Sequence, residues 1–135
     1  MTPTPSPELE MTNKRILLVD DQEDIRLLLQ LSLAPLGCDL HAASNGNEAI
    51  ELARALRPDF VILDVMMPGG MDGYQVCKML RADPGTAHAY IILLSARGQQ
   101  RDIDEGKLAG ADYYMLKPFS PIELGALISQ ARPHQ

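Results

Sequence analysis

The chain is one domain in length, acidic and rich in aliphatic residues. Its 135 residues are 46% hydrophobic but only 4% aromatic, and the formal net charge is −6. A chain of this length buries roughly two-thirds of its unfolded surface, so we expect one aliphatic core. An acidic chain is a poor ligand for nucleic acid or an anionic membrane surface, because neither supplies the counter-charge. The apolar stretches are also too short to span a bilayer.

Neither the chain ends nor the cysteines point to a function. Residues 1–13 hold three prolines, three threonines and little that could be buried, which predicts a disordered tail. A secretory signal would need an apolar segment there. We expect a second short tail over residues 132–135. Cys38 and Cys77 lie in apolar patterns without metal-ligand spacing, which favours buried, reduced thiols in a cytoplasmic protein.

From residue 14 the chain alternates between short apolar runs and helical patterns. The apolar runs predict buried strands at 15–19, 60–63 and 90–94, with a short strand at 40–44 and a fifth strand at 113–116. Helices are expected at about 23–36, at about 47–57, from Asp72 onward, at 98–109 and from Ser120 onward. This alternation predicts a three-layer α/β domain with a five-stranded parallel sheet.

Three of the expected helices carry further signals. The first has an apolar face made of Ile25, Leu28, Leu29, Leu33 and Leu36. The last begins with the capping-box pattern Ser120-Pro121-Ile122-Glu123 and should bury Leu124, Leu127 and Ile128. In the segment 98–109, Gly98 and Gly106 each cost about 1 kcal/mol relative to Ala. That segment should therefore be the least stable element and the easiest to move.

Charged or hydroxyl side chains follow four of the expected strands. Asp20-Asp21 ends the first, Asp64 the third, Ser95 the fourth and Lys117 the fifth. The carboxyl ends of parallel strands share one edge, so these side chains should converge. Three carboxylates there repel one another, and Mg²⁺ relieves that repulsion. A lysine and a hydroxyl beside the metal suit a phosphoryl group, which points to phosphoryl transfer onto an aspartate.

The ordered set VDD, LDVMMP, DG, LLSA and KPF resembles the receiver domain of two-component, or phosphorelay, response regulators. The resemblance covers residues 14–131 and leaves 1–13 and 132–135 as tails. It implies a flavodoxin-like (βα)5 sandwich that acts as a phosphorylation-dependent signalling switch. It also implies that the protein is no enzyme beyond catalysing its own phosphorylation and slow dephosphorylation.

The same resemblance implies a role for each strand-end residue. Asp64 would accept a phosphoryl group from a sensor histidine kinase or a histidine phosphotransfer protein. Asp20 and Asp21 would hold Mg²⁺, together with Asp64 and the backbone carbonyl of Met66. Lys117 would pair with the phosphoryl group, next to a cis peptide bond to Pro118.

Two further residues match the switch of this family. Ser95 stands at the family's Thr or Ser position, where its hydroxyl moves to the phosphoryl oxygen. Tyr114 stands at the aromatic switch position and is expected to swing inward as Ser95 moves. The segment after Ser95 would then change state. The face formed by the fourth helix, fifth strand and fifth helix would control a downstream protein target.

The chain departs from the family pattern after the acceptor. Two residues, Gly69 and Gly70, stand where one is usual, which lengthens the loop and puts the position of Asp72-Gly73 in doubt. Phosphoryl lifetime in the family depends on the positions held here by Met66 and Arg97. An apolar side chain and a long cation should hinder an attacking water, so we expect slow self-dephosphorylation.

The first helix offers a candidate docking surface. Leu27 and Leu31 lie four residues apart, off the core face. They are either tolerated surface leucines or a ridge for the kinase, which contacts this helix in the family. Direct contact with nucleic acid or membrane is not expected. We expect a monomer or a phosphorylation-dependent dimer, either as a single-domain receiver or as a piece of a longer regulator.

Other functions fit the sequence less well. A haloacid-dehalogenase-like phosphatase needs a second carboxylate two residues after the acceptor, and Met66 stands there. A flavin- or nucleotide-binding module needs a phosphate-cradling loop after the first strand, where this chain has acidic residues. The remaining alternative keeps the fold without the chemistry, as a non-phosphorylated receiver-like scaffold for protein–protein interaction.

Overall fold

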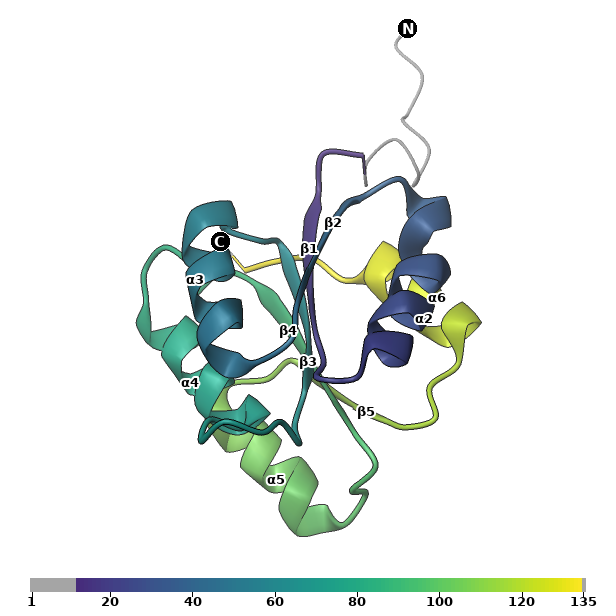
Figure 1. Cartoon of the computed structure of the whole chain (residues 1–135). Helices are drawn as coiled ribbons and strands as arrows, with labels where there is room; N and C mark the ends of the chain where they lie inside the picture. Colours follow the sequence, from purple (N-terminus) through teal and green to yellow (C-terminus); the bar gives the residue numbers. More distant parts are fainter. Residues whose placement is uncertain (1–11, 135) are drawn as a thin grey trace, which may run out of the picture.

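Five strands form one parallel sheet in the order β2-β1-β3-β4-β5, with helices on both faces. The computed structural model describes residues 12–134 (Figure 1). The strands are β1 (Arg15–Val19), β2 (Asp39–Ala43), β3 (Phe60–Asp64), β4 (Tyr90–Ser95) and β5 (Tyr113–Leu116). The helices are α2 (Glu23–Leu33), η1 (Ala34–Leu36, a 3-10 turn), α3 (Gly46–Leu56), α4 (Gly73–Ala82), α5 (Gln100–Ala109) and α6 (Pro121–Gln130).

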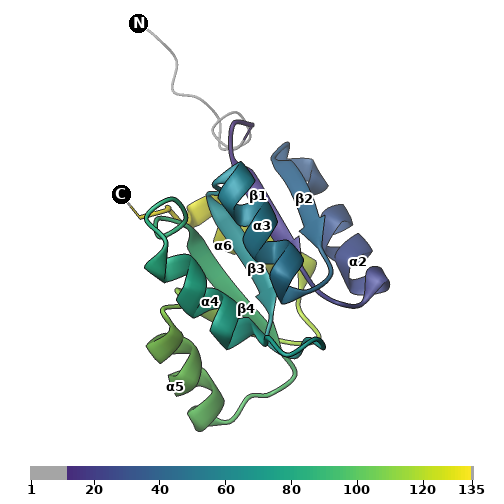
Figure 2. The same ribbon diagram turned by 60° about the vertical axis from the view of Figure 1, so that its left-hand side comes forward.

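The helices divide into two layers because successive strand residues point to opposite faces of the sheet. Leu17 and Val19 of β1 pack in one cluster with α3, α4 and α5, whereas Ile16 and Leu18 pack in another with α2 and α6. Figure 2 shows α3, α4 and α5 side by side on one face. The three-layer α/β prediction is confirmed, and the fold is the flavodoxin-like (βα)5 sandwich that the resemblance implied.

The first helix differs from its prediction in two ways. It ends at Leu33, and a 3-10 turn containing Pro35 continues the chain to Gly37, whose φ is +74°. Leu28 was expected on the buried face but is 42% exposed, so that prediction is wrong. The buried residues of α2 are Leu29 and Leu33, four residues apart, and Leu28 lies about 100° around the helix from Leu29.

The expected cysteine burial holds for one residue of two. Cys77 on α4 is buried, and burial raises the pKa of its thiol to about 11. Cys38 is only half-buried, because it lies in the short connection between η1 and β2 at the sheet margin. Its thiol pKa is nevertheless raised by desolvation.

The chain ends differ in what the structure describes. Most of the expected tail over residues 1–13 lies outside the described residues. Ser120 caps α6 by accepting a hydrogen bond from the amide of Glu123 at 3.2 Å. Beyond α6, the amide of His134 donates to the carbonyl of His88 at 2.7 Å. No helix among residues 12–134 has the length and apolar character needed to cross a membrane.

Candidate functional site

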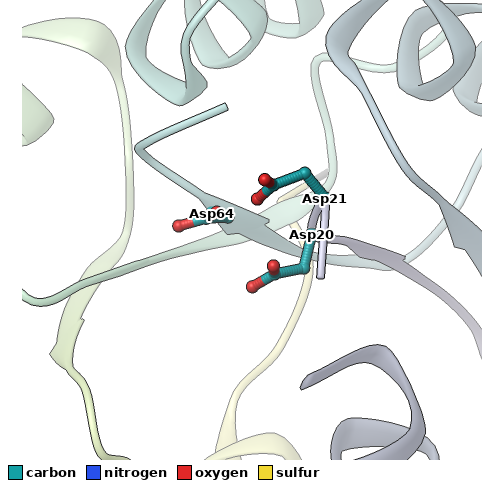
Figure 3. Close-up of side chains that lie close together, drawn as sticks. All are labelled: Asp20, Asp21 and Asp64. Atoms are coloured by element: carbon teal, nitrogen blue, oxygen red, sulfur yellow. The ribbon is translucent and has the colours of Figure 1, made fainter. Parts of the chain in front are cut away.

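Three carboxylates meet at the carboxyl edge of the sheet (Figure 3). Asp20 and Asp21 follow β1, Asp64 ends β3, and the two strands are paired neighbours. One oxygen from each carboxylate lies within 4.8 Å of the others. Asp20 and Asp64 are only 0% and 3% exposed, whereas Asp21 faces solvent. The strand ends therefore converge as the sequence predicted.

Lys117, which follows β5 at the same edge of the sheet, brings a cation to this cluster. Its Nζ lies 3.0 Å from Oδ2 of Asp20 and 3.2 Å from Oδ1 of Asp64. Burial disfavours the ammonium charge, but the bond to Asp20 and the charge of Asp64 outweigh it and raise the pKa of Lys117. The lysine is therefore a fixed positive charge beside Asp64. The peptide bond between Lys117 and Pro118 is cis, as predicted.

The negative charge of the Asp64 carboxylate is only partly balanced by Lys117. Burial and the charge of Asp20 raise its pKa to about 6, although Lys117 acts in the opposite direction. The amide of Met66 donates to Asp64 Oδ1 at 3.3 Å, which also favours the ionised form. Three carboxylates and one ammonium leave a negative cluster of hard oxygen ligands. This donor set fits a small divalent cation such as Mg²⁺.

The backbone of Asp64 is held by the start of α4. Gly73 donates its amide to the carbonyl of Val65 at 2.9 Å. A Cβ on Gly73 would lie 2.4 Å from the Asp64 carbonyl oxygen, so only glycine fits there. Asp72 forms a full capping box at the start of the same helix.

The extra glycine does not disturb this contact. Gly69 and Gly70 have φ values of +93° and +85°, and nothing lies within 4 Å of a Cβ at either position. The longer loop meets no neighbouring atoms at these two positions, and Gly73 still packs on the end of β3 while Asp72 caps α4. The extra glycine therefore leaves Asp72 and Gly73 in place at the start of α4.

Ser95 and Tyr114 are joined through the backbone of Arg97. Ser95 ends β4 at the same edge and is buried, and its Oγ accepts from the Arg97 amide at 3.0 Å. The hydroxyl of half-buried Tyr114 donates to the Arg97 carbonyl at 2.8 Å. The first loop residues after β4 are thus held from two sides, whereas the Arg97 side chain is exposed.

Sequence reasoning missed one residue of this network. Tyr74 is 4% exposed, and its hydroxyl lies 3.1 Å from the Asp102 carbonyl and 3.4 Å from the Tyr114 hydroxyl. The sequence signal for Tyr74 was its position directly after Asp72-Gly73. A tyrosine on the apolar face of a helix usually indicates a core residue, so this signal was not used.

The remaining candidates are all on the surface. Met66 is 50% exposed beside the cluster. Leu27 and Leu31 are 54% and 64% exposed on α2, and exposed Leu28 joins them in one leucine ridge.

A parallel (βα)5 sandwich with acidic residues and a lysine at its carboxyl edge defines a class of signalling domain, and comparison with known proteins names it. The response regulator receiver domain family matches residues 16–129, and the chain belongs to this family. Its members take part in phosphorylation-based signalling.

Similar proteins include regulators with longer chains. The alkaline phosphatase synthesis transcriptional regulatory protein PhoP of Bacillus subtilis is 45% identical over 116 residues, which are 86% of this chain and 47% of PhoP. The DNA-binding response regulator MtrA of Mycolicibacterium smegmatis is 40% identical over 120 residues, which are 89% of this chain and 51% of MtrA. The chain thus spans about half the length of these curated relatives.

Solved structures agree with the fold. The chemotaxis protein CheY4 of Vibrio cholerae is similar with a TM-score of 0.82 and 30% identity, over 87% of this chain and 98% of CheY4. A putative response regulator from Chloroflexus aurantiacus has a TM-score of 0.80 and 36% identity, over 86% and 94% of the two chains.

Proposed function

We propose that Asp64 accepts a phosphoryl group from the phosphohistidine of a sensor histidine kinase or a histidine phosphotransfer protein. The observation that supports this most is the position of Lys117, whose ammonium bonds both Asp64 and Asp20 at the sheet edge. An oxygen of Asp64 forms the new bond to phosphorus as the donor's N–P bond breaks. The electron pair of the broken bond stays on the imidazole nitrogen.

Charge at the site is managed by groups that are already in place. The Lys117 ammonium would neutralise oxygens of the transferred group, because it is held at Asp64 before the reaction. Mg²⁺ would be held by Asp20, Asp21 and Asp64 and by the Met66 carbonyl. When bound, Mg²⁺ supplies further positive charge to the phosphoryl oxygens. The raised pKa of Asp64 supports a need for that charge.

Ser95 and Tyr114 would carry the change of state. A hydroxyl has one proton to donate and two lone pairs, so Ser95 can donate to a phosphoryl oxygen while it accepts from Arg97. Movement of Ser95 would shift Arg97 and, through its carbonyl, Tyr114. Segment 98–109, which contains α5, is the expected mobile element.

The output would be read on the face of α5, β5 and α6, which are the fourth helix, fifth strand and fifth helix of the expected fold. Several exposed side chains on this face are apolar, and Tyr113 lines two hollows there. The exposed large apolar residues there are Leu108, Tyr113, Leu116 and Ile122. A downstream protein would bind this face, either as a partner of a monomer or through a phosphorylation-dependent dimer, in the cytoplasm.

Two surfaces would set input and lifetime. The leucine ridge of Leu27, Leu28 and Leu31 would dock the phosphodonor protein. Met66 and Arg97, exposed beside Asp64 and Ser95, would hinder an attacking water and give slow self-dephosphorylation.

Residues 14–131 would form the receiver domain, flanked by tails over 1–13 and 132–135.

Intact-protein mass tests this proposal. Wild type, Asp64→Asn and a control, Asp39→Asn, are incubated with acetyl phosphate with and without Mg²⁺. Asp39 is an exposed carboxylate at the start of β2, at the opposite edge of the sheet. We expect one Mg²⁺-dependent phosphoryl group on wild type and control and none on Asp64→Asn. An unmodified wild type would overturn the proposal and favour the scaffold.

A further inference from the structure

Two tyrosines from different elements meet beneath the loop that follows β4. Tyr74 comes from the first turn of α4 and Tyr114 from β5, and their hydroxyl oxygens lie 3.4 Å apart. Tyr114 donates to the carbonyl of Arg97, in the loop. Tyr74 reaches the carbonyl of Asp102, in the first turn of α5. Four segments of the chain therefore meet at two hydroxyl groups.

Counting protons shows how the bonds are shared. Each phenol has one proton and can accept further bonds. The Tyr114 hydroxyl donates its proton to the Arg97 carbonyl at 2.8 Å, and the Tyr74 hydroxyl donates to the Asp102 carbonyl at 3.1 Å. The Tyr74 oxygen then keeps free lone pairs that face the Tyr114 hydroxyl. The Tyr114 proton has two acceptors within reach, and it can use only one at a time.

Tyr74 is fixed relative to the acceptor strand. Its neighbour Gly73 packs directly on the carbonyl of Asp64 and bonds the carbonyl of Val65. Tyr74 itself is 4% exposed, so it has little freedom to move. Arg97, Asp102 and Tyr114 lie on the segments that the proposed switch moves.

Gly106 of α5 leaves the space in which the Tyr114 ring lies. A Cβ on Gly106 of α5 would lie 3.0 Å from Cδ2 of Tyr114 and 3.1 Å from a methyl group of Leu93. The ring of Tyr114 therefore lies closely against α5. A change in the ring position and a change in α5 are coupled by this contact.

We propose that Tyr74 is a positioning residue of the switch: its hydroxyl anchors α5 through Asp102 and offers Tyr114 a second acceptor when the Arg97 carbonyl moves away. This inference rests on the proposed role of Tyr114. A half-buried hydroxyl is costly to leave unpaired, so when the Arg97 carbonyl moves away the second acceptor favours the inward position expected of Tyr114. Without it, Tyr114 would turn out to water.

The test compares Tyr74→Phe, Tyr114→Phe and the double variant in the full chain. The matched control is Tyr90→Phe, which removes a hydroxyl at the start of β4, away from the loop, that makes no hydrogen bond among residues 12–134. Beryllofluoride, a phosphoryl mimic, is titrated at fixed Mg²⁺ and followed by amide NMR. Loss of one hydrogen bond should raise the half-saturating concentration for Tyr74→Phe about three- to tenfold.

The double variant separates a switch role from a structural one. We expect Tyr74→Phe to have a smaller effect in the Tyr114→Phe background than in wild type, because only the bond to Asp102 is then lost, and Tyr90→Phe to match wild type. Fully additive effects, or a Tyr74→Phe variant that behaves like Tyr90→Phe, would overturn the inference.

Hydrogen exchange without any phosphoryl mimic distinguishes this inference from the proposed function. Tyr74→Phe should speed exchange of the α5 amides and leave α2 and α6 unchanged. This readout holds even for a protein that takes up neither acetyl phosphate nor beryllofluoride, a result that would overturn the proposed function alone. Exchange that rises equally in all helices would mean a general loss of stability and would overturn the inference.

Discussion

The ammonium of Lys117 lies 3.2 Å from Oδ1 of Asp64, although 53 residues separate them in the chain. Asp64 ends β3 and Lys117 follows β5, with β4 between the two strands. The parallel sheet is what brings the pair together, since every strand ends at the same edge.

Removal of the Lys117 charge should slow phosphorylation of Asp64. For Lys117→Ala we expect the rate with acetyl phosphate and Mg²⁺ to fall about 100-fold, because a preorganised charge is lost where negative charge must be held. Intact mass against time measures the rate. Lys107→Ala, an exposed lysine in the last turn of α5, is the control and should match wild type. Equal rates for both variants would contradict the assignment of Lys117.

The stability of the Mg²⁺-free protein should depend on pH through Asp64. Burial and the charge of Asp20 raise its pKa from 3.8 to about 6, so the folded state binds a proton more tightly than the unfolded state. This contribution is complete below the unfolded pKa and is lost as pH rises through about 6.

Asp64→Asn should therefore be more stable than wild type at pH 7.5, by on the order of 2 kcal/mol, and the difference should vanish near pH 4. Urea unfolding at several pH values in EDTA measures it. A difference that does not change with pH would argue against the raised pKa.

The lifetime of the phosphorylated protein should shorten when water gains access. We expect Met66→Asn combined with Arg97→Asn to raise self-dephosphorylation about tenfold, since polar, shorter side chains neither exclude nor displace an attacking water. Loss of the adduct mass after removal of acetyl phosphate gives the rate. Met79→Asn, an exposed methionine on α4, serves as the control. An unchanged lifetime in the double variant would count against the role of both residues.

Three glycines should respond differently to alanine. Gly73→Ala should cost about 2–4 kcal/mol, because its Cβ would overlap the Asp64 carbonyl at 2.4 Å. Gly70→Ala meets no atom but has φ +85°, so we expect a loss of about 1 kcal/mol. Gly125→Ala lies in α6 with open space around it and should gain up to about 1 kcal/mol. Urea unfolding ranks the three, and equal costs for Gly73 and Gly70 would contradict the close contact.

Loss of the leucine ridge should slow phosphotransfer from protein phosphodonors but not from acetyl phosphate. For Leu27→Ser with Leu31→Ser we expect phosphotransfer from a phosphorylated histidine phosphotransfer protein to fall about tenfold, because apolar contact area is lost. Phosphorylation by acetyl phosphate should not change. Leu108→Ser, 85% exposed on α5, is the matched control. A loss with both phosphodonors would show damage to the site rather than to docking.

Much of this architecture follows from local patterns in the amino-acid sequence. Runs such as residues 60–63 predict strands buried on both faces, because every residue in them is apolar. Each of these runs stops at a charged or hydroxyl residue. Since parallel strands end at one edge, the meeting of Asp20, Asp64 and Lys117 was predictable without any distance. The ordered motifs then indicated the family.

Local sequence patterns did not predict the contacts between elements. Helical periodicity alone did not show that Leu28 turns outward, since Leu29 and Leu33 decide which side of α2 meets the core. Nor did a tyrosine in a helix indicate the bonds from Tyr74 to Asp102 and Tyr114. Residue type and spacing carry the periodic and strand-end signals. Orientation and hydrogen-bond partners depend on how α2, α4 and α5 pack on the sheet, because those contacts join residues far apart in the chain.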